Sequence, residues 1–128
     1  MIEIILPWSP TVNRYYSKTR THVYISPKGK NFREDVVEAL AQQVPDLCLT
    51  DTRLFVECVL FPPDRRKRDL DNHIKSLLDA LTQAGVWEDD SQIDQLHIYR
   101  GEIVDKGLIH MRIYEAGPII KRNSRVPD

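Results

Sequence analysis

Four consecutive cationic residues run directly into two aspartates near the middle of the chain. Residues 65–68 read Arg-Arg-Lys-Arg, Asp69 and Asp71 follow, and Lys75 comes four residues after Asp71. Cationic side chains bind a phosphodiester backbone, and carboxylates are ligands that Mg²⁺ prefers. The adjacency of the two groups indicates metal-dependent phosphodiester cleavage.

A second acidic cluster, Glu-Asp-Asp at 88–90, lies beyond the helix that should follow Asp71. A helix of about 15 residues is roughly 22 Å long. Asp90 therefore starts far from Asp71, and two routes to a common site stay open. Either the chain turns back after Trp87, or a second subunit of a dimer supplies the contact.

A structural interpretation competes with the functional one. Asp69 and Asp71 would then cap a helix, residues 88–90 would form a solvated turn, and Lys75 would make an ordinary i,i+4 ion pair worth a few tenths of a kcal/mol. On residue chemistry alone the two interpretations are evenly balanced. His73, next to the aspartates, is expected to face solvent or to contact a phosphate.

The composition is that of one ordinary globular domain. The chain has 128 residues, 41% of them hydrophobic and 29% charged, and a net charge of −1. This charge is no global signature of nucleic-acid binding, so only the local clustering of cations carries information. Cys48 and Cys58 lack metal-ligand spacing and are expected to be reduced thiols. No segment resembles a signal peptide or a membrane span, so a cytoplasmic protein is expected.

The elements that must position the aspartates follow from periodicity and punctuation. Strands are predicted at 2–6, 54–61, 93–104 and 108–114, with a brief extended segment at 22–25. Ser26-Pro27 is typical of a helix start, and the helix is predicted to run to about Gln43. A second helix has an apolar stripe of Ile74, Leu77, Leu78 and Leu81, and Gly85 should end it. Residues 105–107 suggest a hairpin turn between the last two strands.

The predicted order is β-α-β-α-β-β. It indicates an α+β fold, a single small domain with a mixed sheet and two main helices packed on it. The domain is expected to cover residues 1–116. Residues 117–128 are expected to form a basic C-terminal tail with a composition typical of disorder.

Two motifs resemble one known family. The central motif comprises PDRRKRDLDN at 63–72, Lys75, DALT at 79–82, Ala-Gly at 84–85 and Trp-x-Asp-Asp at 87–90. The N-terminal motif comprises Leu-Pro-Trp-x-Pro at 6–10 and Asn-Arg-Tyr-Tyr at 13–16. Both resemble the RusA-type Holliday junction resolvases, and the likeness covers essentially residues 1–116.

The resemblance implies a homodimeric, Mg²⁺-dependent endonuclease that resolves four-way DNA junctions by paired symmetric nicks during recombination and repair. Members of this family are often encoded by prophages. By resemblance, Asp69, Asp71 and Asp90 are the metal-binding carboxylates and Lys75 is the catalytic lysine. Asn72 would support them.

The predicted DNA contacts gather the nearby cations and aromatics. They are Arg14, Tyr15, Tyr16, Arg65, Arg66, Lys67, Arg68 and Asn72, with Lys18 and Arg20 as further candidates. The two tyrosines would either stack on bases or pack in the core or at an interface. An alternative is a non-catalytic, structure-specific DNA-binding protein in which the carboxylates are helix caps. A third interpretation, an RNA-processing or generic nuclease, differs from the first in its substrates.

Overall fold

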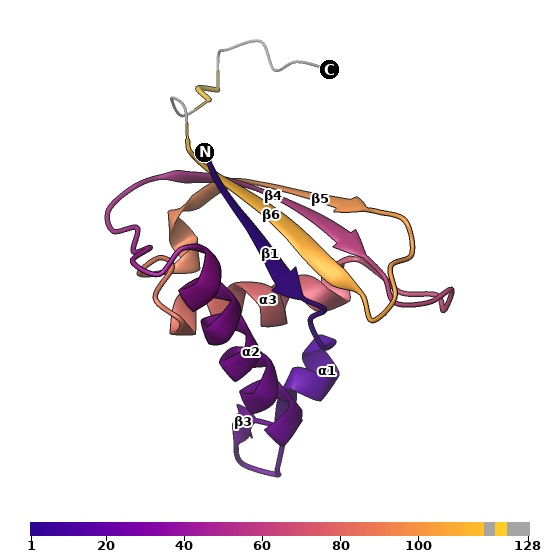
Figure 1. The fold of residues 1–128 in the computed structure, drawn as a ribbon. Coiled ribbons are helices and arrows are strands. Elements are labelled where there is room, and N and C mark those ends of the chain that lie inside the picture. Colours follow the sequence, from indigo (N-terminus) through magenta and orange to yellow (C-terminus); the bar gives the residue numbers. More distant parts are fainter. Residues whose placement is uncertain (117–119, 123–128) are drawn as a thin grey trace.

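A four-stranded mixed sheet carries two helices on one face in the computed structural model (Figure 1). Its strands are β1 (Ile2–Pro7), β4 (Leu54–Phe61), β5 (Ile93–Arg100) and β6 (Leu108–Glu115). They lie in the order β1-β6-β4-β5, and only the β4–β5 pair is parallel. The predicted α+β class, the mixed sheet and the two main helices are confirmed.

The structure describes residues 1–116 and 120–122. The prediction of a disordered basic tail falls mainly on 117–119 and 123–128, which lie outside the described residues. Within the described part of the chain, no helix is long and apolar enough to cross a membrane.

The predicted hairpin between the last two strands is wrong. β6 lies between β1 and β4, whereas β5 lies on the other side of β4, at the edge of the sheet. The reason is the helix between β4 and β5, which makes a crossover long enough for these two strands to pair in parallel. Residues 101–107 then carry the chain across the end of β4, where the Gly101 N–H donates to the Leu60 carbonyl.

Both long helices begin and end where local signals predict. In α2 (Pro27–Gln43) the Ser26 Oγ accepts a hydrogen bond from the Gly29 N–H at 3.0 Å, which confirms the predicted N-cap. In α3 (Asp71–Gln83) the chain leaves the helix at Gly85, whose φ of +84° is costly for other residues.

The core lies between the sheet and these two helices. Along β4 every second side chain is buried, which places Leu54, Val56, Cys58 and Leu60 on the helix-facing side. Leu77, Ala80 and Leu81 of α3 and Phe32, Val36 and Leu40 of α2 complete this core. Burial raises the pKa of the Cys58 thiol to about 12, as expected for a packing residue rather than a reactive one.

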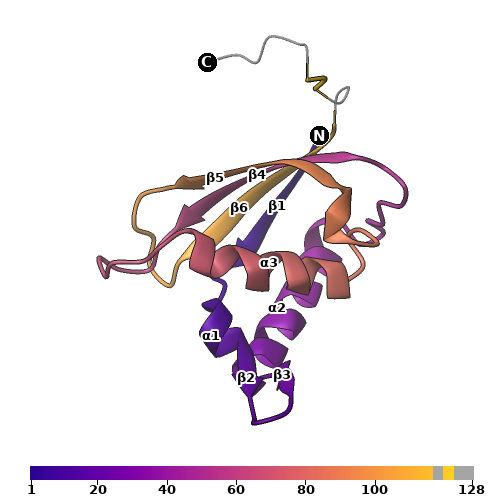
Figure 2. The ribbon, with the colours of Figure 1, turned by 180° about the vertical axis from the view of Figure 1, so that it is seen from behind.

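A small projection extends from the two helices on the side away from the sheet (Figure 2). It consists of the short helix α1 (Val12–Tyr15) and a hairpin of β2 (Tyr16–Lys18) and β3 (Val23–Ile25). The Ser26 side chain ties the base of this projection to α2 by donating to the Arg14 carbonyl. The projection therefore holds residues 13–18 beside α3.

Candidate functional site

Asp69 and Asp71 lie exposed at the start of α3. The N-cap position between them is Leu70, and no side chain caps the helix there. The interpretation of these aspartates as helix caps is therefore wrong. Asp71 instead lies in the first turn, where the helix dipole stabilises negative charge. Because neither Asp69 nor Asp71 caps the helix, both carboxylates are free for a ligand.

Asp90 lies beyond the other end of α3, as the first residue of the short 3-10 helix η1 (Asp90–Gln92). Its neighbour Asp89 is the capping residue here, because it accepts a hydrogen bond from the Ser91 N–H. The pKa of Asp90 is raised by partial burial and by the nearby carboxylates of Asp89 and Asp79. Asp90 is exposed, but of this acidic cluster it is the carboxylate whose pKa is raised by its surroundings.

One protomer does not unite the three aspartates that the resemblance assigns to the metal. Helix α3 has 13 residues, which makes it about 20 Å long. Asp71 is at its start, whereas Asp90 is near Asp79 in its C-terminal half. Across residues 1–116 and 120–122, no three His, Cys, Asp or Glu residues are arranged to hold a metal ion.

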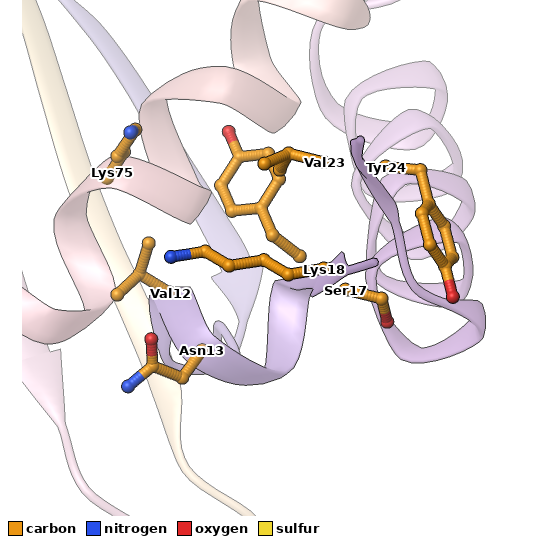
Figure 3. A pocket seen from close by; sticks show the side chains of 8 residues that line it. Val12, Asn13, Ser17, Lys18, Val23, Tyr24 and Lys75 are labelled. Atoms are coloured by element: carbon orange, nitrogen blue, oxygen red, sulfur yellow. The ribbon is translucent and has the colours of Figure 1, made fainter. Parts of the chain in front are cut away.

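Lys75 faces a pocket between α3 and the projection. This pocket, here called the lysine pocket, has a volume of about 750 Å³, and its lining includes Val12, Asn13, Tyr16, Lys18 and Lys75 (Figure 3). The Lys75 Nζ lies 5.5 Å from the centroid of the Tyr16 ring. Among the described residues it forms no ion pair with Asp71, so the structural interpretation of Lys75 is not supported.

Tyr16 connects the lysine pocket with Asp90. The pKa of its hydroxyl is raised first by partial burial and then by the negative charges of Asp79 and Asp90, with Arg33 acting in the opposite direction. Tyr16 therefore lies near both Lys75 and Asp90, whereas Asp71 is one helical turn before Lys75, at the start of α3.

A second pocket, here called the cationic pocket, lies on the other side of α1. It has a volume of about 530 Å³ and is lined by residues of the loop after β1, of α2 and of the segment before α3. Its cations are Arg14, Lys28, Arg66, Lys67 and Arg68, accompanied by one carboxylate, Asp35. Four of the predicted cations thus meet in space with Lys28, whereas Arg65 does not line this pocket. Sequence reasoning did not find Lys28, because the pattern of α2 marks it only as a solvent-facing residue.

The members of the cationic run differ in their freedom. Arg65, Arg66 and Lys67 are exposed. Arg68 is half-buried, donates to Asp64 Oδ1 at 2.7 Å and lies over the Trp8 ring at 5.8 Å from its centroid. The Arg68 guanidinium, together with the Arg66 N–H, lowers the pKa of Asp64 to about 2. Arg68 therefore also orders the loop. Arg65 and Lys67 are free to contact a phosphate backbone, and Arg66, although highly exposed, also lies 3.9 Å from Asp64 Oδ2 through its Nε.

His73 is buried, which contradicts the expectation of a solvent-facing or phosphate-contacting residue. Its side chain is only 2% exposed, its Nδ1 donates to the Ser9 carbonyl at 2.8 Å, and its ring packs on Trp8. Burial lowers the pKa of His73, and the charges of Arg68 and Arg100 lower it further. Position 73 lies on the core-facing side of α3 with Ser76 and Leu77, which explains the difference.

Tyr15 is also buried, with 0% exposure, so the suggestion that it stacks on bases is wrong and its alternative role in packing holds. Its hydroxyl donates to Asp79 Oδ2 and accepts a hydrogen bond from Arg33 Nε at 2.7 Å. Arg33 and Asp79 also form a salt bridge at 2.8 Å. This network joins α1, α2 and α3. Sequence reasoning missed its Arg33 because the contact joins residues 46 apart.

Residues 7–114 match the sequence model of the family Endodeoxyribonuclease RusA. A protein of Enterobacteria phage HK97 named "Crossover junction endodeoxyribonuclease rusA" is 39% identical over 113 residues, covering 88% of this chain and 93% of that protein. Proteins of the corresponding name from Shigella sonnei and Escherichia coli K12 are 37% and 36% identical over 115 residues, covering 89% of this chain and 94% of each relative.

Proposed function

This chain belongs to the RusA family of endodeoxyribonucleases, and on that premise we propose that it resolves four-way DNA junctions as a Mg²⁺-dependent homodimer. Its relatives are named crossover junction endodeoxyribonucleases. Two of them come from phages, which supports a prophage origin. The observation that carries the proposal is the exposed cationic segment 65–67. It is followed closely by two exposed aspartates at the start of α3 whose side chains do not cap the helix.

The donor set at the start of α3 fits a magnesium ion. Asp69 and Asp71 offer only carboxylate oxygens, both are exposed, and no helix cap competes for them. Mg²⁺ takes one or two protein carboxylates and completes its shell with waters and phosphate oxygens. When bound, the ion would supply Lewis-acid chemistry to the phosphate and to the attacking water.

We assign the third carboxylate to the partner. Within a protomer, Asp71 begins α3, whereas Asp90 begins η1, beyond the C-terminal end of that helix. If two α3 helices run antiparallel across a two-fold axis, Asp90 of the partner subunit comes beside Asp71, and the same contact repeats at the second site. A four-way junction also has approximate two-fold symmetry, so two identical sites match its two equivalent strands.

The remaining groups bind and orient the DNA. Lys75 lies one turn beyond Asp71 on the same side of α3, where its ammonium offsets negative charge on the scissile phosphate. Arg65, Arg66 and Lys67 hold the backbone beside that phosphate. Arg14 and Lys28 continue this positive surface around the cationic pocket.

Cleavage of a synthetic four-way junction tests the function. We expect the wild type to introduce paired nicks with Mg²⁺ and the Asp71→Asn variant to bind the junction without cutting it. Asp46→Asn, which alters an exposed loop carboxylate, serves as the matched control and should cut normally. Junction binding without any nicking in Mg²⁺ or Mn²⁺ would instead establish the non-catalytic DNA-binding alternative.

The same assay separates a junction resolvase from a generic nuclease. Duplex DNA, single-stranded DNA and RNA of matched sequence are offered beside the junction. We expect cutting to be confined to the junction. Comparable rates on all four substrates would contradict junction resolution while leaving the metal site in place.

A further inference from the structure

The lysine pocket combines a stacking surface with polar groups that suit the edge of a nucleobase. Tyr16 is half-buried, and the edge-on ring of Tyr15, 4.7 Å away and inclined at 79°, fixes its position. Val12 and Val23 add apolar surface, and the exposed Asn13 amide offers both a donor and an acceptor. A phosphate alone would contact only the polar groups of this lining, so the apolar and aromatic surface indicates a ligand that also carries a ring.

Two ammonium groups flank this surface. Lys18 extends from the end of β2 into the pocket, and Lys75 approaches from α3 (Figure 3). In the part of the chain that the structure describes, neither lysine forms a salt bridge with a carboxylate. Lys75 instead lies over the π face of Tyr16, a weak partner that an anionic phosphate would readily replace.

The volume of about 750 Å³ is sufficient for one nucleotide. Single-stranded nucleic acid is held by aromatic rings that stack on bases and by cations that contact the adjoining phosphates. The lysine pocket has both an aromatic ring, that of Tyr16, and two cations, Lys18 on β2 and Lys75 on α3. Lys75 also places the pocket one helical turn from Asp71, next to the proposed position of the cut.

We propose that the lysine pocket binds one unpaired base of a junction strand, with the adjoining phosphate between Lys18 and Lys75. This inference rests on the proposed function, since it places the base beside the phosphate that is cut. Bases at a crossover lose a stacking neighbour and leave the helix at lower cost than bases inside a duplex. The pocket thus selects junctions over continuous duplex DNA.

The test combines altered junctions with altered proteins and measures the affinity of each pair in the absence of Mg²⁺. One nucleotide beside the cleavage position is replaced by an abasic site, and each neighbouring position is scanned in turn. We expect one abasic position to weaken wild-type binding by about 5- to 150-fold, the range for loss of one stacked base. Tyr16→Leu and Asn13→Ala should each weaken binding to the intact junction. For these two variants the abasic site should reduce the affinity far less than it does for the wild type.

Tyr99→Leu is the matched control, because Tyr99 is 48% exposed on β5, outside the pocket. The abasic site should weaken the junction binding of this variant as much as it weakens that of the wild type. Asn13 is exposed, so Asn13→Ala retains the test if Tyr16→Leu fails to fold. Lys18→Gln should reduce the salt dependence of junction binding by one phosphate contact and leave duplex binding unchanged.

The outcome separates this inference from the proposed function. If the wild type nicks the junction but no abasic position weakens its binding, the base pocket is wrong and the resolvase assignment stands. The base pocket is equally wrong if the abasic penalty persists in both pocket variants. If the penalty appears without any nicking in Mg²⁺, the pocket is retained and the assignment as a nuclease fails.

Discussion

Asp71 is the first residue of α3, whereas Asp90 begins η1 beyond the C-terminal end of the same helix. The rigid helix between them keeps these two carboxylates apart in a single subunit. A metal site that needs both must therefore draw them from two subunits. In the proposed homodimer, this relationship would make dimerisation a condition of catalysis rather than only a match to the symmetry of the junction, and mixing experiments can examine it.

Mixing two inactive variants should restore activity. If each site pairs Asp71 of one subunit with Asp90 of the partner subunit, a mixed dimer of Asp71→Asn and Asp90→Asn chains contains one intact site and one doubly altered site. Random reassortment makes about half of the dimers mixed, so about a quarter of wild-type nicking is expected. Nicking is measured after co-refolding the two variants at equal concentration.

Sites built within single subunits make the opposite prediction for this mixture. Each subunit then carries one altered aspartate, and the mixture stays as inactive as its components. Co-refolded Asp71→Asn and Asp69→Asn chains provide the control. These two residues belong to the same subunit's half-site, so this pair should remain inactive under either arrangement.

The exposed cations before Asp69 should dominate the salt dependence of junction binding. Each phosphate contact contributes about 0.9 to the slope of log affinity against log salt for B-form DNA. The double variant Arg65→Ala/Arg66→Ala should therefore lower the slope by up to about 2. Arg112→Ala, on the outer face of the sheet, should leave it unchanged, and an unchanged slope in the double variant would remove these arginines from the footprint.

The Tyr15 hydroxyl should contribute substantially to stability. It is buried, donates to Asp79 and accepts from Arg33, so Tyr15→Phe removes two hydrogen bonds to charged groups. We expect a loss of about 2 kcal/mol in the free energy of unfolding, measured by urea denaturation. Tyr24→Phe, whose ring is 50% exposed, should change the unfolding free energy little, and equal effects of both variants would argue against the network.

His73 should make the protein less stable as the pH falls below about 7. Burial holds its folded-state pKa below the reference value of 6.5, so the unfolded chain binds more protons in this range. The free energy of unfolding should therefore decrease from pH 7 to pH 5. In His73→Leu this decrease should be smaller, whatever the variant's stability at pH 7, and equal pH dependence in both proteins would contradict the buried neutral histidine.

Much of the local structure was accessible from the sequence because its causes are local. Ser26 and Pro27 mark the start of α2, Gly85 marks the end of α3, and alternation along 54–61 predicts β4 with its observed bounds. Each of these signals depends on residues a few positions apart.

The same reasoning failed where contacts join distant segments. The partner of β5 depends on which strand the crossover helix can reach, and turn residues at 105–107 favoured a hairpin instead. Likewise, position 73 reads as an exposed neighbour of the aspartates until Ser9, 64 residues away, packs against it.

For the candidate site, the order of residues was enough to establish which chemistry is present: cations followed by carboxylates at 65–71, with Lys75 one turn later. It could not establish which of these groups meet, because Asp71 begins α3 whereas Asp90 begins η1, beyond the C-terminal end of that helix. Folding separated those carboxylates, buried Tyr15 and His73, and brought Lys18 of the hairpin to the pocket of Lys75. Packing between remote segments sets those positions, and no spacing along the chain encodes it.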